Sequence, residues 1–237
     1  RVPFGDVDAL EAAITPDTAA FLVEPIQGEG GIVVPPPGYL SRCAEICRRH
    51  DVLLIADEVQ TGLGRTGRLL ACDHEGVRPD GLILGKALGG GLLPVSAFLA
   101  DRRVMDVFGP GDHGSTFGGN PLAAAVGTEV LALLTETRPW ERAERLGERL
   151  IARLRSTALP CVREVRGRGL LIGLALDPAL ADAGEVAERL LARGIATRDT
   201  HGNVIRLAPP LVIDEATLDE AASRIVDTLR ALVPADA

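Results

Sequence analysis

The sequence predicts an α/β protein in which a mainly parallel sheet is followed by a smaller α+β region. Continuous apolar runs of strand length recur in the first part of the chain, and runs without polar alternation are typical of a sheet covered on both faces. A helical pattern over residues 39–50 separates two of these runs, which indicates a βαβ unit. After Asn120-Pro121 long helical patterns replace the short runs, which indicates a second region.

The apolar runs and helical periodicity give the expected elements. In the first part we expect strands over residues 20–23, 52–56, 82–84 and 95–100. In the second part we expect helices over about 122–135, 140–155, 184–193 and 214–232, and strands over 162–165, 169–176, 195–197 and 204–207. The predicted organisation is a larger domain over residues 1–124, linking helices over 125–157 and a small C-terminal domain over 158–237.

Composition and charge argue against several classes of function. The 237 residues carry a net charge of −8 without a basic cluster, which argues against nucleic acid as a partner. We find no apolar stretch of membrane-spanning length and no signal peptide, and we expect a cytoplasmic protein with no membrane partner. Cys43, Cys47 and His50 share one helix face, but no further ligand cluster accompanies them, so we expect reduced cysteines and no metal site.

Lys86 is the only lysine beside 24 arginines. A coding bias that replaces lysine with arginine would leave lysine where an amine is needed, because a guanidinium stays protonated and is a poor nucleophile. Glycines at 89–91 would let the backbone pass close to a bulky cofactor. The alternative is a surface lysine that survives by chance.

Asp57 ends an apolar strand, as Lys86 follows one. In a parallel sheet, ligands lie beyond the carboxyl ends of the strands, so both residues are expected in one crevice. A carboxylate there could hold a heterocyclic nitrogen protonated. The alternative is a helix N-cap or a solvated strand end.

Three weaker signals complete the set. The loop over residues 113–121 combines hydroxyls and small residues before a helix, and could bind phosphate or be a simple turn. The glycines around Glu29 do not match the dinucleotide-binding spacing. Arg206 lies within an apolar strand and needs a carboxylate partner, which either the protein or a substrate could supply.

Together these segments resemble the class III (ω-amino) aminotransferases, which are fold-type I enzymes that use pyridoxal 5'-phosphate. The ornithine aminotransferase branch is most similar and the acetylornithine branch next. The resemblance rests on VEPIQGEGG (23–31), ADEVQTG (56–62) with RTG (65–67), LGKALGGG (84–91), the loop 113–121, VRGRGL (165–170) and THGNVIRLAPP (200–210).

The resemblance implies cofactor roles in the first part of the chain. Lys86 would form the Schiff base with pyridoxal phosphate and shuttle the proton, and Asp57 would pair with the pyridine nitrogen. Val59 would pack on the ring face, and Gln60 would contact the phenolic oxygen. Ser115 and Thr116 would reach the phosphate of a partner subunit's cofactor, which implies a homodimer.

The resemblance also implies substrate roles. Glu29 would pair with Arg206 while an amine donor is bound, and would release it to bind a carboxylate of the acid substrate. The expected reaction moves the δ-amine of ornithine to 2-oxoglutarate, giving glutamate 5-semialdehyde and glutamate. Alternatives are acetylornithine or another ω-amino donor, another class III reaction such as aminomutation or racemisation, and a non-catalytic fragment.

The chain departs from the family in length. Family members are much longer, so residues 1–124 would be the C-terminal part of a cofactor-binding large domain. The loop that holds most of the phosphate and the aromatic that stacks on the ring would be missing. We therefore expect a fragment, a split gene product that assembles with an N-terminal half, or a remnant.

Overall fold

A computed structural model describes residues 1–232. The chain divides into two compact units, each built from three segments. Unit 1 comprises Arg1–Pro25, Pro35–Leu63 and Leu69–Arg138, and unit 2 comprises Ile26–Val34, Gly64–Arg68 and the chain from Pro139 onward. The division predicted at residues 124 and 157 stays a prediction.

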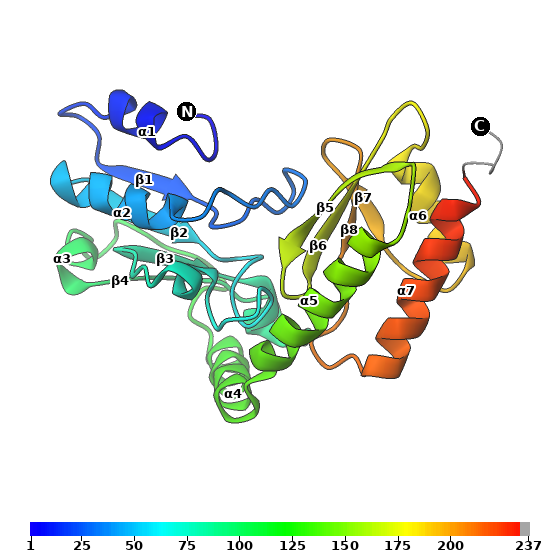
Figure 1. Cartoon of the computed structure of the whole chain (residues 1–237). Helices are drawn as coiled ribbons and strands as arrows, with labels where there is room; N and C mark the ends of the chain where they lie inside the picture. The colour runs from blue at the N-terminus through cyan, green and yellow to red at the C-terminus, as the bar shows by residue number, and fades with distance from the viewer. Residues whose placement is uncertain (233–237) are drawn as a thin grey trace. The chain divides into compact units, whose positions relative to one another are not determined.

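Unit 1 is built around a four-stranded sheet (Figure 1). Its strands lie in chain order: β1 (Ala20–Val23), β2 (Leu53–Asp57), β3 (Gly81–Leu84) and β4 (Ala97–Ala100). The first three strands are parallel, and β4 pairs with β3 in the antiparallel direction. The predicted mainly parallel sheet is confirmed.

Helix α2 (Tyr39–Arg49) covers one face of this sheet. Its apolar side chains recur every three or four residues, so they form one stripe that packs on β1 and β2. Helix α1 (Val7–Ala13), which the sequence patterns did not reveal, begins at Asp6, whose carboxylate accepts a hydrogen bond from the Ala9 N–H.

The opposite face of the sheet is partly exposed. The strand register places Leu22, Ile55, Ile83 and Phe98 on this one face of the sheet. Leu22 is 59% exposed and Phe98 is 41% exposed. Ile55 and Ile83, on the two central strands, are partly buried, so the covering of this face stays a prediction.

Unit 1 contains four further helices. Three of them are short, η1 (Ala71–Glu75), η2 (Lys86–Gly89) and α3 (Arg102–Met105), and one is long, α4 (Pro121–Thr137). Helix α4 begins at Asn120, whose side chain accepts from the Ala123 N–H, and has proline in its first turn. Among the described residues, no helix combines the length and the apolar character needed to cross a membrane.

Unit 2 is an antiparallel sheet of order β5-β6-β8-β7 with three helices. The elements are α5 (Pro139–Ser156), β5 (Val162–Arg168), β6 (Leu171–Leu176), α6 (Ala183–Ala192), β7 (Arg198–Thr200), β8 (Val204–Leu207) and α7 (Glu215–Arg230). The three helices bury their apolar stripes in one cluster with Ile172, Leu174 and Ile205 of the sheet.

Strand β7 begins later than predicted. The predicted strand covered residues 195–197, but the backbone N–H of Ile195 donates to the Leu190 carbonyl and closes the end of α6. Pairing with β8 starts only at Arg198. Ile195 is apolar because it closes the end of α6 and packs against the core. In the sequence, an apolar residue in this position looks the same as an apolar residue in a strand.

The other face of this sheet is covered by the segment Ile26–Val34. Ile32 is buried against Leu171 of β6. A Cβ atom added at Gly173 would lie 3.0 Å from the Ile32 Cβ, so the glycine makes room for this contact. Arg206 pairs with Gly173 across the strands, and therefore lies on the face that this segment covers.

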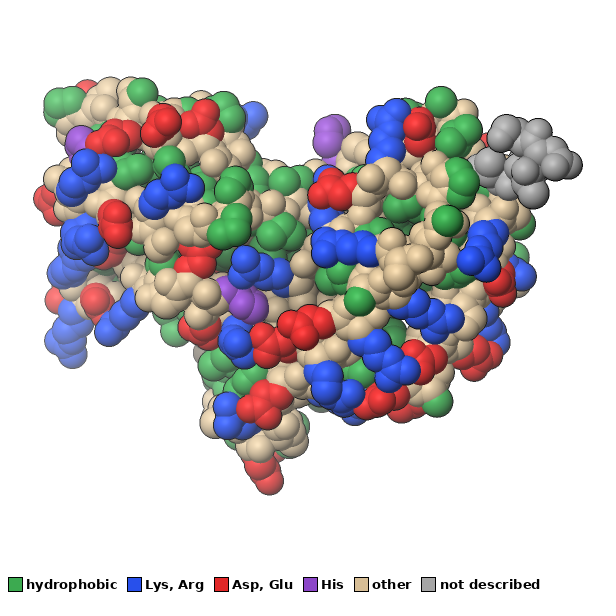
Figure 2. Space-filling model, viewed as in Figure 1, with side chains coloured by type: hydrophobic (Ala, Val, Ile, Leu, Met, Phe, Trp, Pro, Cys, Tyr) green, Lys and Arg blue, Asp and Glu red, His purple; other side chains and the backbone are tan. Residues whose placement is uncertain are grey.

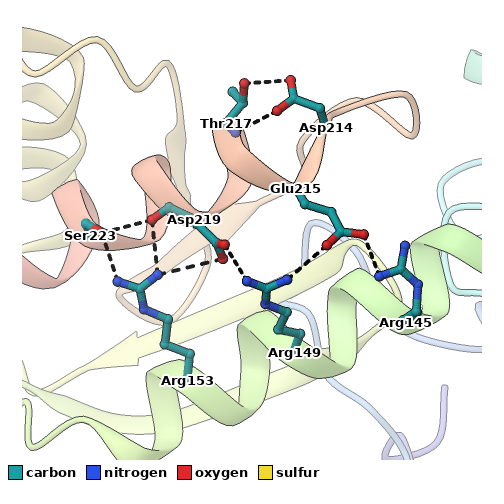
Figure 3. A network of polar contacts seen from close by, with 8 residues as sticks. All are labelled: Arg145, Arg149, Arg153, Asp214, Glu215, Thr217, Asp219 and Ser223. Carbon is teal, nitrogen blue, oxygen red and sulfur yellow. Dashed lines mark hydrogen bonds and ion pairs between the residues drawn. The ribbon is translucent and has the colours of Figure 1, made fainter.

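A ladder of ion pairs joins α5 to α7 (Figure 3). Arg145 and Arg149 both bind Glu215, at 2.7 and 3.1 Å, and Arg149 also pairs with Asp219. Arg153 donates to the Ser223 hydroxyl at 2.8 Å. Basic and acidic side chains accordingly alternate over these helices on the surface (Figure 2).

Candidate active site

Asp57 and Lys86 lie at the same edge of the unit 1 sheet. Asp57 is the last residue of β2 and pairs in register with Ile83 of β3. Lys86 follows the end of β3 by two residues. Because β2 and β3 are parallel, their carboxyl ends meet at one edge, as the sequence predicted.

Lys86 has an unusual backbone. Its φ is +44°, a left-handed conformation that residues with a Cβ rarely adopt, and its side chain is exposed. Gly85 precedes it, and a Cβ atom there would lie 3.3 Å from the Val59 Cγ1. Val59 thus packs closely on the backbone that presents the amine. Strained backbone of this kind is frequent at functional sites.

A cavity of about 450 Å³ adjoins Lys86. Its wall is formed by residues 94–96, residues 117–120 and Ala123 at the start of α4. This volume lies within the range of about 300–1,000 Å³ that is usual for small-molecule sites. Lys86 therefore borders a space of the size that small-molecule ligands occupy.

Two adjacent carboxylates at the end of β2 have opposite environments. Asp57 is half-buried, and its Oδ1 accepts a 3.0 Å hydrogen bond from the Val59 N–H. Glu58 is 1% exposed and accepts from the Thr61 hydroxyl at 2.5 Å and from the N–H groups of Ala71 and Cys72 at 2.9 and 2.8 Å. Glu58 thus fixes the segment that follows Asp57.

Sequence reasoning did not assign a role to Glu58. The available signal was the acidic pair directly after an apolar strand, because neighbouring side chains of an extended segment point to opposite sides. One of the two carboxylates therefore had to face the protein interior, where it needs several hydrogen-bond donors.

The remaining predicted residues of unit 1 lie around this edge. Gln60 is half-buried, one residue beyond Val59. Ser115 and Thr116 are exposed in the loop before α4, and the Ser115 hydroxyl accepts from the Gly118 N–H at 2.9 Å. The cavity wall beside Lys86 is formed by the residues that follow them, from 117 to 120.

Glu29 and Arg206 form an ion pair in unit 2, with 2.5 Å between Oε1 and Nη1. The Arg206 side chain is 18% exposed and that of Glu29 is 64% exposed. Arg166 holds the segment that carries Glu29, because its Nε and Nη2 both donate to the Gly31 carbonyl, at 3.1 and 2.8 Å. Arg166 is a second residue whose contact the sequence did not indicate.

The structure therefore provides two sets of groups. Unit 1 brings an amine, a carboxylate and the apolar Val59 to one sheet edge, where a cavity adjoins the amine-bearing Lys86. These groups fit pyridoxal phosphate, whose ring carries an aldehyde and a basic nitrogen. Unit 2 supplies a carboxylate-bound arginine. The individual roles of these residues stay predictions.

Comparison with known proteins gives consistent matches. The family model described as "Aminotransferase class-III" matches residues 4–229. Ornithine aminotransferases of Bacillus subtilis and Bacillus cereus are 54% and 53% identical to this chain over 97% and 94% of its length. The chain spans 56% of the length of each of these relatives.

Solved structures match in fold as well as in sequence. The ornithine aminotransferase of Toxoplasma gondii, described with partial occupancy of PLP at its active site, superposes with a TM-score of 0.94 at 50% identity. The acetylornithine aminotransferase of Elizabethkingia anophelis gives 0.91 at 48% identity. Each comparison covers 98% of this chain, and 55% and 59% of the respective structure. The chain belongs to the class III aminotransferase family.

Proposed function

We propose that this chain is the cofactor-binding and C-terminal part of an aminotransferase that moves the δ-amine of ornithine to 2-oxoglutarate. The products are glutamate 5-semialdehyde and glutamate. The observation that carries the proposal is the position of Lys86 and Asp57 at the carboxyl ends of two neighbouring parallel strands. The similarity to ornithine aminotransferases over nearly the whole chain supports this choice of amine donor.

The proposed chemistry uses the groups at the sheet edge of unit 1. Bound pyridoxal phosphate supplies an electron sink that allows an amino group to leave one carbon skeleton and join another. Asp57 keeps a negative charge beside the ring nitrogen and so favours its protonated form. Val59 would support a ring face, and Gln60 would contact the phenolic oxygen. The Lys86 amine would hold the cofactor and, once released from it, would take a proton from, or return one to, the carbon that bears the reacting amino group.

Arg206 is proposed to bind a carboxylate of the acid substrate. While Glu29 is in place, the pair is neutral towards an uncharged or amine-bearing chain end. When Glu29 moves away, the guanidinium can bind a carboxylate through two parallel hydrogen bonds. The greater exposure of Glu29 supports this order, because the exposed partner can leave without breaking the packing around the arginine.

We also propose that the active form contains further polypeptide, either a second copy of this chain or a segment equivalent to the remaining length of the relatives. The support is the apolar face of the unit 1 sheet that carries Leu22, Ile55, Ile83 and Phe98 and is partly exposed. Proteins rarely leave such a surface uncovered. Ser115 and Thr116, exposed before α4, are the proposed phosphate contacts across a dimer. Sedimentation of the purified chain, alone and with an added N-terminal half, tests this proposal.

Cofactor binding is tested first. The purified chain is mixed with pyridoxal phosphate, reduced with borohydride, digested and analysed by mass spectrometry. We expect a single phosphopyridoxyl group on Lys86 and a visible absorption band before reduction. Lys86→Arg is the matched control, since it keeps the charge but removes the nucleophile. A label that persists in this variant contradicts the assignment.

The amine donor is tested next, in the presence of the N-terminal half of a close relative. Ornithine, acetylornithine and 4-aminobutyrate are offered with 2-oxoglutarate, and glutamate is measured. We expect ornithine to give the highest kcat/KM. The match to an acetylornithine aminotransferase makes acetylornithine the second candidate. Cofactor labelling without turnover of any donor would instead support the non-catalytic alternative.

A further inference from the structure

Glu29 lies at the tip of a short hairpin in unit 2. The backbones of Gln27 and Val33 exchange two hydrogen bonds, each 3.0 Å long. The Gly28 carbonyl accepts from the Gly31 N–H and from the next N–H along the chain, both at 3.1 Å. Because these bonds join the hairpin to itself, they fix its shape but not its place on the sheet of unit 2.

Arg166 of β5 attaches the tip of this hairpin to the sheet. Its Nε and Nη2 donate to the Gly31 carbonyl at 3.1 and 2.8 Å, so one edge of the guanidinium is directed at one oxygen. Its Nη1 binds the carboxylate of Glu164 at 2.7 Å, which orients the guanidinium from the other side. The Arg166 side chain is only 22% exposed, so water competes little for these charge-assisted bonds.

Arg166 and Arg206 face the hairpin from the two sides of Gly173. The strand register pairs Arg166 of β5 with Gly173 of β6, and Gly173 with Arg206 of β8, so the three residues form one row across the sheet. Directly paired residues of an antiparallel sheet point to the same face. Gly173 leaves the room that Ile32 of the hairpin fills. The hairpin is thus held through its backbone on the β5 side, and meets Arg206 through the Glu29 carboxylate on the β8 side.

The hold of Arg166 on the hairpin affects the competition for Arg206. Glu29 competes for this arginine as a ligand on the same chain, and its effective concentration depends on how firmly its backbone is held. Arg166 supplies part of that hold through the Gly31 carbonyl. Without it the hairpin tip would occupy more positions and the ion pair would form less often. A free carboxylate would then bind Arg206 more tightly.

We propose that Arg166 is a positioning residue for Glu29, and that its bonds to the Gly31 carbonyl set how strongly Glu29 competes with a substrate carboxylate. This inference rests on the proposed exchange of Glu29 for the acid substrate. It predicts a change of unusual sign, because the loss of an anchoring residue improves the binding of one ligand. Damage to the fold alone would weaken that binding instead.

The test measures binding of glutarate, a dicarboxylate without the keto group, by calorimetric titration of the full chain at low salt. We expect Arg166→Gln to lower the dissociation constant about threefold. Arg166→Lys can still donate one of the two bonds, so it should give a smaller gain. Arg163→Gln is the matched control, because Arg163 lies on the same strand in an exposed pair with Asp177. It should bind glutarate as the unaltered chain does.

A double-mutant cycle shows whether Arg166 acts through Glu29. Glu29→Gln removes the competing carboxylate, so we expect it to tighten glutarate binding by itself. In that background Arg166→Gln should have no further effect. A gain that persists in the Glu29→Gln background overturns the inference, because Arg166 would then act by another route.

The outcomes separate this inference from the proposed function. An unchanged or higher dissociation constant in Arg166→Gln overturns the role of Arg166 and leaves the acid-substrate role of Arg206 standing. No glutarate binding by the unaltered chain, or binding that Arg206→Gln does not abolish, overturns both. Thermal melting checks that each variant is folded. If Arg166→Gln is not, Arg166→Lys takes its place and is judged by the same sign.

Discussion

Glu58 and Cys72 are joined by a hydrogen bond of 2.8 Å between a fully buried carboxylate and a backbone N–H. We expect Glu58→Gln to lower the free energy of unfolding by about 1–3 kcal/mol, because the amide places a donor where the carboxylate accepts several hydrogen bonds. Guanidinium titration measures the effect. Glu45→Gln, at an exposed position of α2, is the control and should change stability little. Equal effects of the two substitutions would contradict the anchoring role of Glu58.

Gly31 is predicted to tolerate no side chain. Its φ is +108°, and a Cβ atom would lie 2.8 Å from the His201 carbonyl oxygen. Gly202→Ala is the matched control, since Gly202 has a φ of +79° but nothing within 4 Å of the added atom. We expect Gly202→Ala to cost only backbone strain, about 1 kcal/mol, and Gly31→Ala to cost clearly more. Thermal melting in which Gly202→Ala is less stable than Gly31→Ala would contradict this interpretation of the contact.

Arg149 is predicted to contribute a salt-dependent part of the stability. It links Glu215 and Asp219 of α7 from its place on α5 (Figure 3). All three side chains are partly exposed, so we expect Arg149→Ala to cost about 0.5–1 kcal/mol at low salt and less at about 1 M sodium chloride. Arg189→Ala, exposed on α6, is the control. A loss that does not change with salt would point to packing of the arginine stem instead.

The same ladder predicts loss of stability in acid. The hydrogen bond and charge of Arg145 lower the pKa of Glu215 below its ordinary 4.5. Since the folded pKa is the lower one, the stabilisation is complete above the unfolded value and is lost as the pH falls through the folded value. Glu215→Gln should therefore flatten the dependence of the unfolding midpoint on pH between about 6 and 3. An unchanged slope would contradict this.

The four cysteine thiols are predicted to react only after unfolding. All four are buried, and burial raises the pKa of Cys43 and of Cys47 to about 11. Few thiolates are then present near neutral pH, and the reagent has no access. Release of thionitrobenzoate from Ellman's reagent should be slow in the native protein and rapid in guanidinium. Fast reaction of any thiol under native conditions would show local opening of its surroundings.

Much of the fold could be predicted because its signals are local. The apolar runs at residues 20–23 and 204–207 became strands with those bounds, and the amphipathic stripe of α2 was visible from its spacing. The direction of β4 could not be read from its residues, because an apolar run does not record the direction of the neighbouring strand. Strand β7 was predicted too early because Ile195, an apolar residue, belongs to the end of α6 and not to a strand.

The site shows the same contrast. Asp57 and Lys86 could be found because each lies at the carboxyl end of an apolar strand. The long-range contacts of Arg65 and Arg166 could not be predicted, since they are made to backbone carbonyls 144 and 135 residues away in sequence, and a carbonyl has no residue type to recognise. Pairing of Glu29 with Arg206 was expected only from the family resemblance, and the structure places them in contact, while their part in substrate exchange stays a prediction.

The covering of β6 by Ile26–Val34 has a practical consequence for dissecting the protein. Unit 2 draws on three separate stretches, so no single cut releases it whole. A piece starting at Pro139 would keep the helices on one side of its sheet but lose Ile26 and Ile32 from the other, leaving Leu171 bare. Such a piece is expected to aggregate unless residues 26–34 are returned to it, as a separate peptide or by rejoining the chain in a new order.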